Sequence, residues 1–164
     1  MQRQDANYCL SAASLSSPSG WRLGDKFGRP MAEIHSPIPG FEQHLTPSVD
    51  RFLAHLKVAH PVVRYNWSLQ AGDGLARRPA GHRAVAADTP LYYRTERQTL
   101  RRLPRTGAVA FTIRVYLHPL ELLPGPALVA LWRAVDDTPP ALAHYKGFHR
   151  LAPALARYRS APAQ

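Results

Sequence analysis

Cysteine is almost absent from this sequence of 164 residues, in which Cys9 is the one example. A single cysteine excludes an intrachain disulfide, and it excludes cysteine-based zinc sites and iron–sulfur clusters held by this chain alone. Cys9 itself is either a small buried hydrophobic residue, the more common state of a free cysteine, or a reactive thiol. This usage fits a reducing compartment, and we expect a cytoplasmic protein.

Long apolar runs are missing too. No segment approaches the roughly 18–20 apolar residues that cross a bilayer, so we expect no membrane partner. Residues 1–20 contain Asp5 and only a short apolar stretch, which is not typical of a signal peptide. The sequence also contains no Walker loop, no GxGxxG, no serine nucleophile elbow and no zinc-binding histidine pattern. These common motifs therefore identify no enzyme class here.

Lysine is scarce, whereas arginine is abundant. Three lysines accompany eighteen arginines, and the formal net charge at pH 7 is +10. A basic chain suggests a polyanionic partner, of which nucleic acid is the usual example. The arginine bias has a more specific meaning, because a guanidinium makes planar two-point contacts with carboxylates and phosphates. A GC-rich genome is the alternative explanation of the bias.

Hydrophobic residues make up 45% of the chain, which is enough for a single domain over residues 1–164. Alternating and helical patterns predict an α+β fold with few strands and flanking helices. A Thr95-x-x-Gln98 capping box favours a short helix before Pro104. We expect strands at 62–69, 91–94 and 107–120, a strand or short helix at 8–15, a loop at 71–90, and helices at 46–58, 95–103, 126–135, 138–146 and, more weakly, from 151 onward.

Two of the expected strands carry an arginine beside polar or small residues. Arg64 and Asn66 share one face of the first strand, and Arg114 and Tyr116 share one face of the third. An arginine so placed binds a carboxylate, a phosphate or a cofactor propionate, and two such strands suggest one anion-binding pocket. The alternatives are exposed strand faces or, for Arg114, an ion pair with Glu96.

The segment ERQTLRRLPR holds a further group of arginines. On the expected helix, Arg97 and Arg101 are neighbours at positions i and i+4. This pattern is typical either of a phosphate-binding stripe or of a solvated helix face. The segment lacks the interleaved aromatic residues that favour single-stranded nucleic acid.

His35 lies in the segment MAEIHSPIPG, where Pro37 and Pro39 restrict the backbone to extended or turn conformations. A lone histidine is most often structural or exposed. Its position alone therefore assigns no role to it.

Four segments in order, WRLGDKFGRPMAEIHSPIPGF, RYNWSL, ERQTLRRLPRTGAVAFTIRVYLHPL and HYKGF, resemble the family of haem-dependent oxidative N-demethylase catalytic (alpha) subunits. The resemblance runs from about Tyr8 to Tyr158. The long piece ERQTLRRLPRTGA with its following FTIR strand is the most specific part, and the shorter pieces support it by their order and spacing.

The resemblance implies a PAS-like fold, in which an antiparallel sheet and flanking helices enclose haem b. In the family a histidine ligates the iron, O₂ is activated there, and a methyl group is removed from a small secondary amine such as dimethylamine. Electrons come from NADPH through FMN and [2Fe–2S] partner subunits, and no nucleic acid takes part. Because family members are longer, we expect this chain to be the C-terminal two-thirds of the haem-binding domain.

The resemblance also assigns residues to this monooxygenase-type site. His35 matches the family's iron ligand within IH-x-P-x-P-G, where a proline-rich turn suits a fixed ring, and His118 is the competing candidate. The expected cofactor-binding residues are His35, Arg64, Asn66, Trp67, Arg97 and Arg114, with the arginines pairing with haem propionates or with an anionic redox partner. The expected catalytic residues are Arg64, Glu96 and Tyr116, and a cationic amine would lie against Glu96 or the rings of Tyr65, Trp67 and Tyr116.

Two other functions stay open at this point. The same fold without turnover would be a sensor of haem or of a small ligand. A basic nucleic-acid-binding domain would show binding that falls steeply with salt, and no Soret band.

Overall fold

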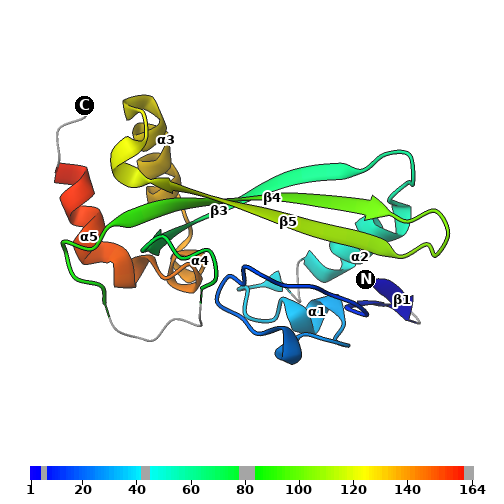
Figure 1. Cartoon of the computed structure of the whole chain (residues 1–164). Coiled ribbons are helices and arrows are strands. Elements are labelled where there is room, and N and C mark those ends of the chain that lie inside the picture. The colour runs from blue at the N-terminus through cyan, green and yellow to red at the C-terminus, as the bar shows by residue number, and fades with distance from the viewer. Residues whose placement is uncertain (5–6, 42–44, 78–83, 161–164) are drawn as a thin grey trace. The chain divides into compact units, whose positions relative to one another are not determined.

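Three long strands form the largest sheet of the computed structural model (Figure 1). They are β3 (Val62–Ala71), β4 (Leu91–Arg102) and β5 (Val109–Pro119), and they pair in the order β3-β4-β5. The structure describes residues 1–4, 7–41, 45–77 and 84–160. Helices accompany two antiparallel sheets, so the predicted α+β class is confirmed.

Shorter elements precede and follow these strands. β1 (Gln2–Gln4) and β2 (Asn7–Cys9) form an antiparallel hairpin in which Arg3 lies opposite Tyr8. Within the described ranges, no helix is long and apolar enough to cross a membrane. In the part of the chain that the structure describes, the helices are η1 (Leu23–Asp25), α1 (Met31–Ile34), α2 (Thr46–His55), η3 (Leu120–Leu122), α3 (Gly125–Asp136), α4 (Pro140–Tyr145) and α5 (Phe148–Ser160).

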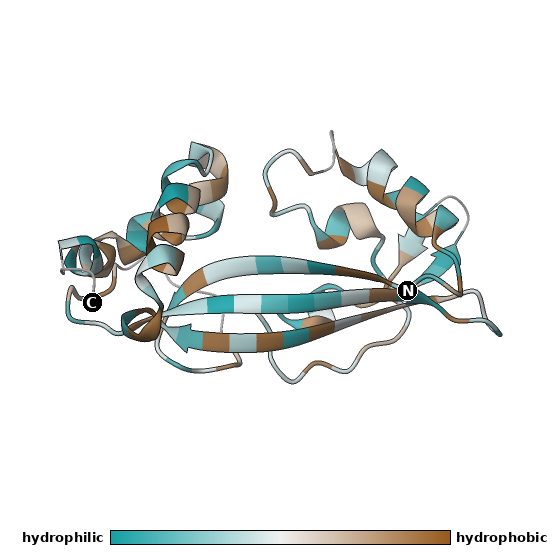
Figure 2. Ribbon diagram, turned by 90° about the horizontal axis from the view of Figure 1, so that it is seen from above, coloured by the Kyte–Doolittle hydropathy of each residue, from teal (hydrophilic) through white to brown (hydrophobic). Residues whose placement is uncertain are grey.

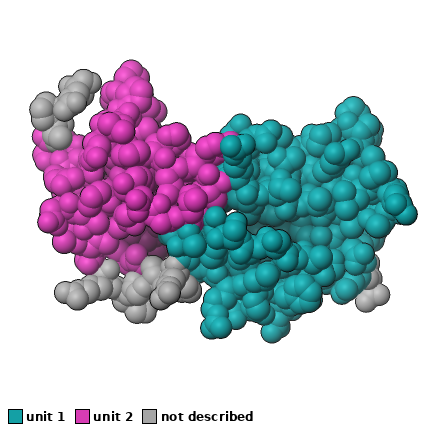
Figure 3. Space-filling view, in the orientation of Figure 1, with its two compact units in different colours: residues 1–66, 76–79, 96–114 teal, residues 67–75, 80–95, 115–164 magenta. Residues whose placement is uncertain are grey.

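Two compact units divide the chain (Figure 3). Unit 1 comprises residues 1–66, 76–79 and 96–114, and unit 2 comprises residues 67–75, 80–95 and 115–164. The divisions between 66 and 67, 95 and 96, and 114 and 115 fall inside the long strands, so β3, β4 and β5 each contribute to both units.

Unit 1 has a small apolar core under its part of the sheet. Leu53 of α2 and Leu56 just beyond that helix pack with Tyr8, Leu100 and Val109, and all five are buried. Two backbone hydrogen bonds of 2.8 Å join Met1 to Val109, one in each direction. The start of the chain is therefore tied to the start of β5.

Unit 2 has a larger apolar core, built mainly by α5. Phe148, Leu151 and Leu155 of that helix pack against Leu69 and Leu91 of the strands. The predicted helix over 126–135 is confirmed as α3, and its Leu131 belongs to the same core. Burial of the leucines of α3 and α5 follows from the helical spacing of the apolar residues.

The helix predicted over 95–103 is wrong, because these residues continue β4. Glu96, Gln98 and Leu100 are buried while Arg97 and Arg101 are exposed, which is the period of two that a strand imposes. Tertiary contacts outweigh helix propensity here, since the buried polar side chains hydrogen-bond to one another. In Figure 2, hydrophilic and hydrophobic residues are accordingly mixed along the three strands.

Of the strand or short helix predicted over 8–15, only the three-residue strand β2 at 7–9 is present. The other predicted helices and strands are present with shifted ends. Strand 62–69 extends to 71, strand 107–120 spans 109–119, helix 46–58 ends at 55, and helix 138–146 spans 140–145. Helix α2 begins at Thr46, whose hydroxyl donates to the Phe41 carbonyl at 3.4 Å. Cys9 is buried, as the ordinary interpretation predicted. Parts of the predicted loop and C-terminal helix, at 78–83 and 161–164, lie outside the described residues.

Candidate functional site

A buried carboxylate lies at the centre of a polar cluster in unit 1. Glu96 of β4 is 8% exposed. Its two oxygens accept hydrogen bonds from the Ser19 hydroxyl at 2.7 Å, the Gln98 amide at 3.0 Å and the Asn66 amide at 3.5 Å. Burial of a carboxylate is costly unless such donors replace water, so the three donors explain how the chain holds Glu96 there.

Arg64 joins this cluster through Gln98. The Arg64 Nε–H donates to the Gln98 amide oxygen at 2.6 Å, while the Gln98 amide nitrogen donates to Glu96. Because side chains alternate along a strand, Arg64 and Asn66 lie on one face of β3. Their hydrogen bonds show that this face and the buried face of β4 are on the same side of the sheet. A chain of hydrogen bonds therefore links the guanidinium to the carboxylate.

His35 lies at the C-terminal end of α1, where the helix gives way to the proline-rich turn. Its backbone N–H donates to the Met31 carbonyl at 3.1 Å, and its own carbonyl accepts from the Ile38 N–H at 2.8 Å. The Phe41 N–H then donates to the Ile38 carbonyl at 3.1 Å. These consecutive bonds define the backbone on both sides of the histidine.

The imidazole of His35 is held by two contacts. Its Nδ1 lies 2.9 Å from the Met31 carbonyl oxygen, and its ring stacks on the ring of buried Phe41, with centroids 4.5 Å apart. A carbonyl oxygen is only an acceptor, so Nδ1 carries the proton in this contact. In the neutral ring, Nε2 is then left with its lone pair, which is the form that binds a metal ion.

The surroundings of His35 favour that neutral form. Burial of the ring lowers the pKa of His35 below 6.5, the bond to Met31 opposes this effect, and the positive charges of Arg64 and Lys26 lower the pKa further. Lys26 is held close by because its ammonium donates to the Ile34 carbonyl at 2.7 Å. His35, Arg64 and the Glu96 cluster therefore belong to one electrostatic neighbourhood in unit 1.

A pH dependence of stability follows from the lowered pKa of His35. The unfolded chain takes up a proton near pH 6.5 and the folded chain does not, so the free energy of unfolding should fall as pH drops below 6.5. Urea unfolding from about pH 7.5 to about pH 5.5 measures this slope. His35→Gln should reduce the slope and exposed His60→Gln should not. Equal slopes for both variants would contradict the assignment.

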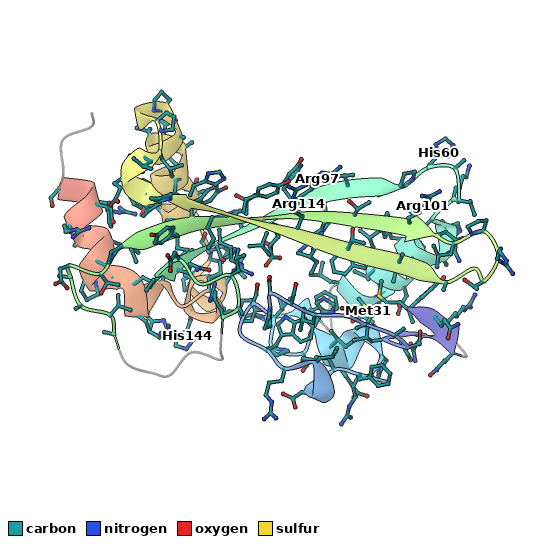
Figure 4. All side chains as sticks on the ribbon, viewed as in Figure 1. Met31, His60, Arg97, Arg101, Arg114 and His144 are labelled. Carbon is teal, nitrogen blue, oxygen red and sulfur yellow. The ribbon has the colours of Figure 1, made fainter. Side chains whose placement is uncertain are left out.

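Arg97 and Arg114 lie on the opposite face of the sheet from Arg64. Arg97 alternates with buried Glu96 and Gln98, and it is exposed. The β4–β5 hairpin closes on a hydrogen bond between Leu103 and Ala108, and counting outward from this pair places Arg97 opposite Arg114. Figure 4 shows both arginines on one side of the strands and Met31 of α1 on the other.

The remaining predicted site residues belong to unit 2. The Trp67 ring lies 6.0 Å from Phe148 between centroids and 4.4 Å from the ammonium of Lys146, which also donates to the Trp67 carbonyl at 2.6 Å. Tyr116 is partly buried and the competing ligand His118 is exposed, both on β5. Within the described residues, no group of three or more histidine, cysteine or acidic side chains could hold a metal ion.

A protein-family model for haem-dependent oxidative N-demethylase, alpha subunit-like, matches residues 1–156. The chain belongs to this family. Its resemblance in four short segments is thereby confirmed over nearly the whole length. The alpha-subunit description also implies that other subunits exist, and the haem description implies dependence on haem.

Sequence reasoning missed four residues of this candidate site: Ser19, Lys26, Phe41 and Gln98. Phe41 was visible as the aromatic residue that ends the IHSPIPGF turn, and Gln98 as the partner two positions from Glu96 on a strand. Ser19 carried no signal, because its partner Glu96 lies 77 residues away in the sequence. Lys26 carried none because its partner is a backbone carbonyl, that of Ile34, which no residue type marks.

Proposed function

We propose that this chain binds haem b with His35 as the iron ligand, and that it catalyses oxidative N-demethylation of a small secondary amine such as dimethylamine. The observation that carries the proposal is the contact between His35 Nδ1 and the Met31 carbonyl. A histidine whose Nδ1 is bound to a backbone carbonyl has its tautomer and ring orientation set for metal binding through Nε2. The porphyrin supplies four further nitrogens, so one histidine suffices.

The haem, when bound, would supply the oxygen chemistry, and the residues of this chain would position the reactants. Arg64 would anchor a propionate. Its Nε already donates to Gln98, whereas its Nη groups make no hydrogen bond within the described residues and could donate to a carboxylate. Asn66 lies on the same face of β3 and would add an amide donor. The roles expected for Trp67 and Tyr116 in unit 2 stay predictions.

Glu96 would recognise the amine. A secondary amine is a cation at neutral pH and carries N–H donors, which suit a carboxylate acceptor. The Ser19 hydroxyl and the Asn66 and Gln98 amides, three neutral donors, show that this carboxylate accepts N–H and O–H groups from more than one side. The carboxylate would hold the ammonium and accept its proton. Gln98, which accepts a hydrogen bond from Arg64 and donates one to Glu96, would keep the carboxylate in position.

The order of elements in unit 1 supports a PAS-like arrangement. The β1–β2 hairpin comes first, the short helices follow, and the long strands come last. The hydrogen bonds between Met1 and Val109 connect the hairpin to β5. We place the reaction in the cytoplasm, with electrons from NADPH through FMN and [2Fe–2S] partner subunits.

The test is a haem titration followed by turnover. The purified chain should give a Soret band with haem, and the loaded protein should release formaldehyde from dimethylamine when a flavin and [2Fe–2S] reductase, NADPH and O₂ are supplied. Tetramethylammonium, a cation that has no N–H, serves as a comparison substrate. Haem binding without formaldehyde would favour a haem sensor, and absence of a Soret band would contradict the whole proposal.

A further inference from the structure

The outer face of the sheet in unit 1 carries a group of exposed residues that the proposed haem site does not use. We call it the arginine face, and it consists of Arg97 and Arg101 of β4, Arg114 of β5, and Val63 and Tyr65 of β3. The bonds from Arg64 and Asn66 to buried residues of β4 put the even-numbered positions of β3 inward. Val63 and Tyr65 therefore share the outward face with Arg97 and Arg101.

The positive charge of this face has no acidic counterpart on the strands. β3, β4 and β5 contain one acidic residue among them, Glu96, and it is buried on the opposite face. Among the described residues, no hydrogen bond or ion pair involves the side chain of Arg97 or Arg101, and both are exposed. Their guanidinium groups are accordingly available to an anion in solution.

Apolar surface accompanies these charges. Tyr65 is 66% exposed and Val63 is 43% exposed. Tyrosine and arginine are the residues most enriched where proteins bind one another, because each offers a large contact area with a polar group at its end. Exposed aromatic and aliphatic surface beside arginine is thus typical of a protein interface.

We propose that the arginine face docks an acidic protein partner that delivers electrons to this chain. The inference uses membership of a family of alpha subunits, which implies further subunits, and it adds a surface to the proposed function. Carboxylates on the partner would pair with Arg97 and Arg101, and charge attraction of this kind speeds association. RNA fits less well, because Tyr65 is the one aromatic residue in the group and base stacking uses several.

The experiment compares two double charge reversals. Arg97→Glu with Arg101→Glu removes the arginine face, and Arg22→Glu with Arg51→Glu makes the same change in net charge at two other exposed positions of unit 1. The probe is a purified flavin and [2Fe–2S] reductase subunit of an oxidative N-demethylase, titrated at about 50 mM and about 200 mM salt. The Soret band of each variant reports the haem site separately.

We expect the first double variant to bind the reductase at least about tenfold more weakly than the parent, and the control to change by less than about threefold. Tyr65→Ala should also weaken binding, and the Soret bands should not change. Equal weakening by both double variants, or no binding of the reductase by the parent, would overturn the proposal. Tighter binding of a uridine homopolymer than of the reductase, lost in the first variant, would overturn it in favour of RNA.

Discussion

His35→Gly should lower the haem affinity of this protein by about 100-fold, the scale on which ligand-shell changes act in metal sites. The variant removes the imidazole that the Met31 carbonyl and the Phe41 ring hold in place. Free imidazole at high concentration should restore much of the Soret band, because the glycine leaves a space of the shape of the lost ring. The measurement is a haem titration by absorption, with and without imidazole.

The matched control is His118→Gly, since His118 was the competing ligand predicted from the sequence. It is exposed on β5, so its loss should leave the haem spectrum unchanged. A spectrum that is lost in His118→Gly and retained in His35→Gly would reassign the ligand. Rescue by imidazole distinguishes a missing ligand from a chain that no longer folds.

Arg102→Ala should destabilise the fold by roughly 2–4 kcal/mol, the range for loss of a network of hydrogen bonds to a charged group. The Arg102 guanidinium donates to the carbonyls of Leu53, Ala54 and Leu56 at the end of α2. It also donates to the Gly107 carbonyl at 2.7 Å and the Tyr8 hydroxyl at 3.1 Å. One side chain thus joins α2, the β4–β5 hairpin and β2. It also satisfies carbonyl groups at the end of α2 that lack a partner within the helix.

The neighbouring Arg101 provides the control, because it is exposed and its side chain lies on the opposite face of β4. Arg101→Ala should change the free energy of unfolding by less than about 0.5 kcal/mol. Arg102→Lys should restore little, since an ammonium cannot reach so many carbonyls at once. Chemical unfolding followed by circular dichroism measures all three, and similar losses for Arg101→Ala and Arg102→Ala would refute the role of the network.

The sequence predicted most elements of the fold because their cores are apolar. The helical spacing of Leu128, Leu131, Trp132 and Val135 locates α3 within a residue at each end. Branched and aromatic residues likewise locate β5. In both cases the signal is the regular spacing of apolar residues in the sequence, which locates β5 even though Phe111 and Ile113 are exposed.

The helix predicted over 95–103 was wrong because two buried residues of this segment are polar and not apolar. Its buried positions hold Glu96 and Gln98, which look like residues of a solvated helix until their partners are known. Those partners, Ser19 and Arg64, lie 77 and 34 residues away in the chain. Buried polar clusters are therefore poorly visible in a sequence, although this one is where the candidate site lies.

The roles of the arginines also depend on contacts that the sequence does not show. The sequence left Arg64, Arg97 and Arg114 equally open to a propionate or to a redox partner. Their assignment to faces needed the pairing of the strands, since a shift of one residue exchanges the two faces. With that pairing, Arg64 faces the carboxylate cluster, whereas Arg97 and Arg114 lie on the other side.

The Met31 carbonyl accepts two hydrogen bonds from His35, one from its backbone N–H and one from its ring Nδ1–H. Its contribution comes from the main chain, so replacing the Met31 side chain leaves the acceptor intact. Because the Met31 side chain packs against the core of unit 1, a saturation screen would record Met31 as tolerant of other apolar residues and His35 as essential for the proposed haem binding, although the two act together. An ester in place of the Met31–Ala32 peptide bond weakens that carbonyl as an acceptor, and its effect on haem binding would measure the contribution of the Met31 carbonyl.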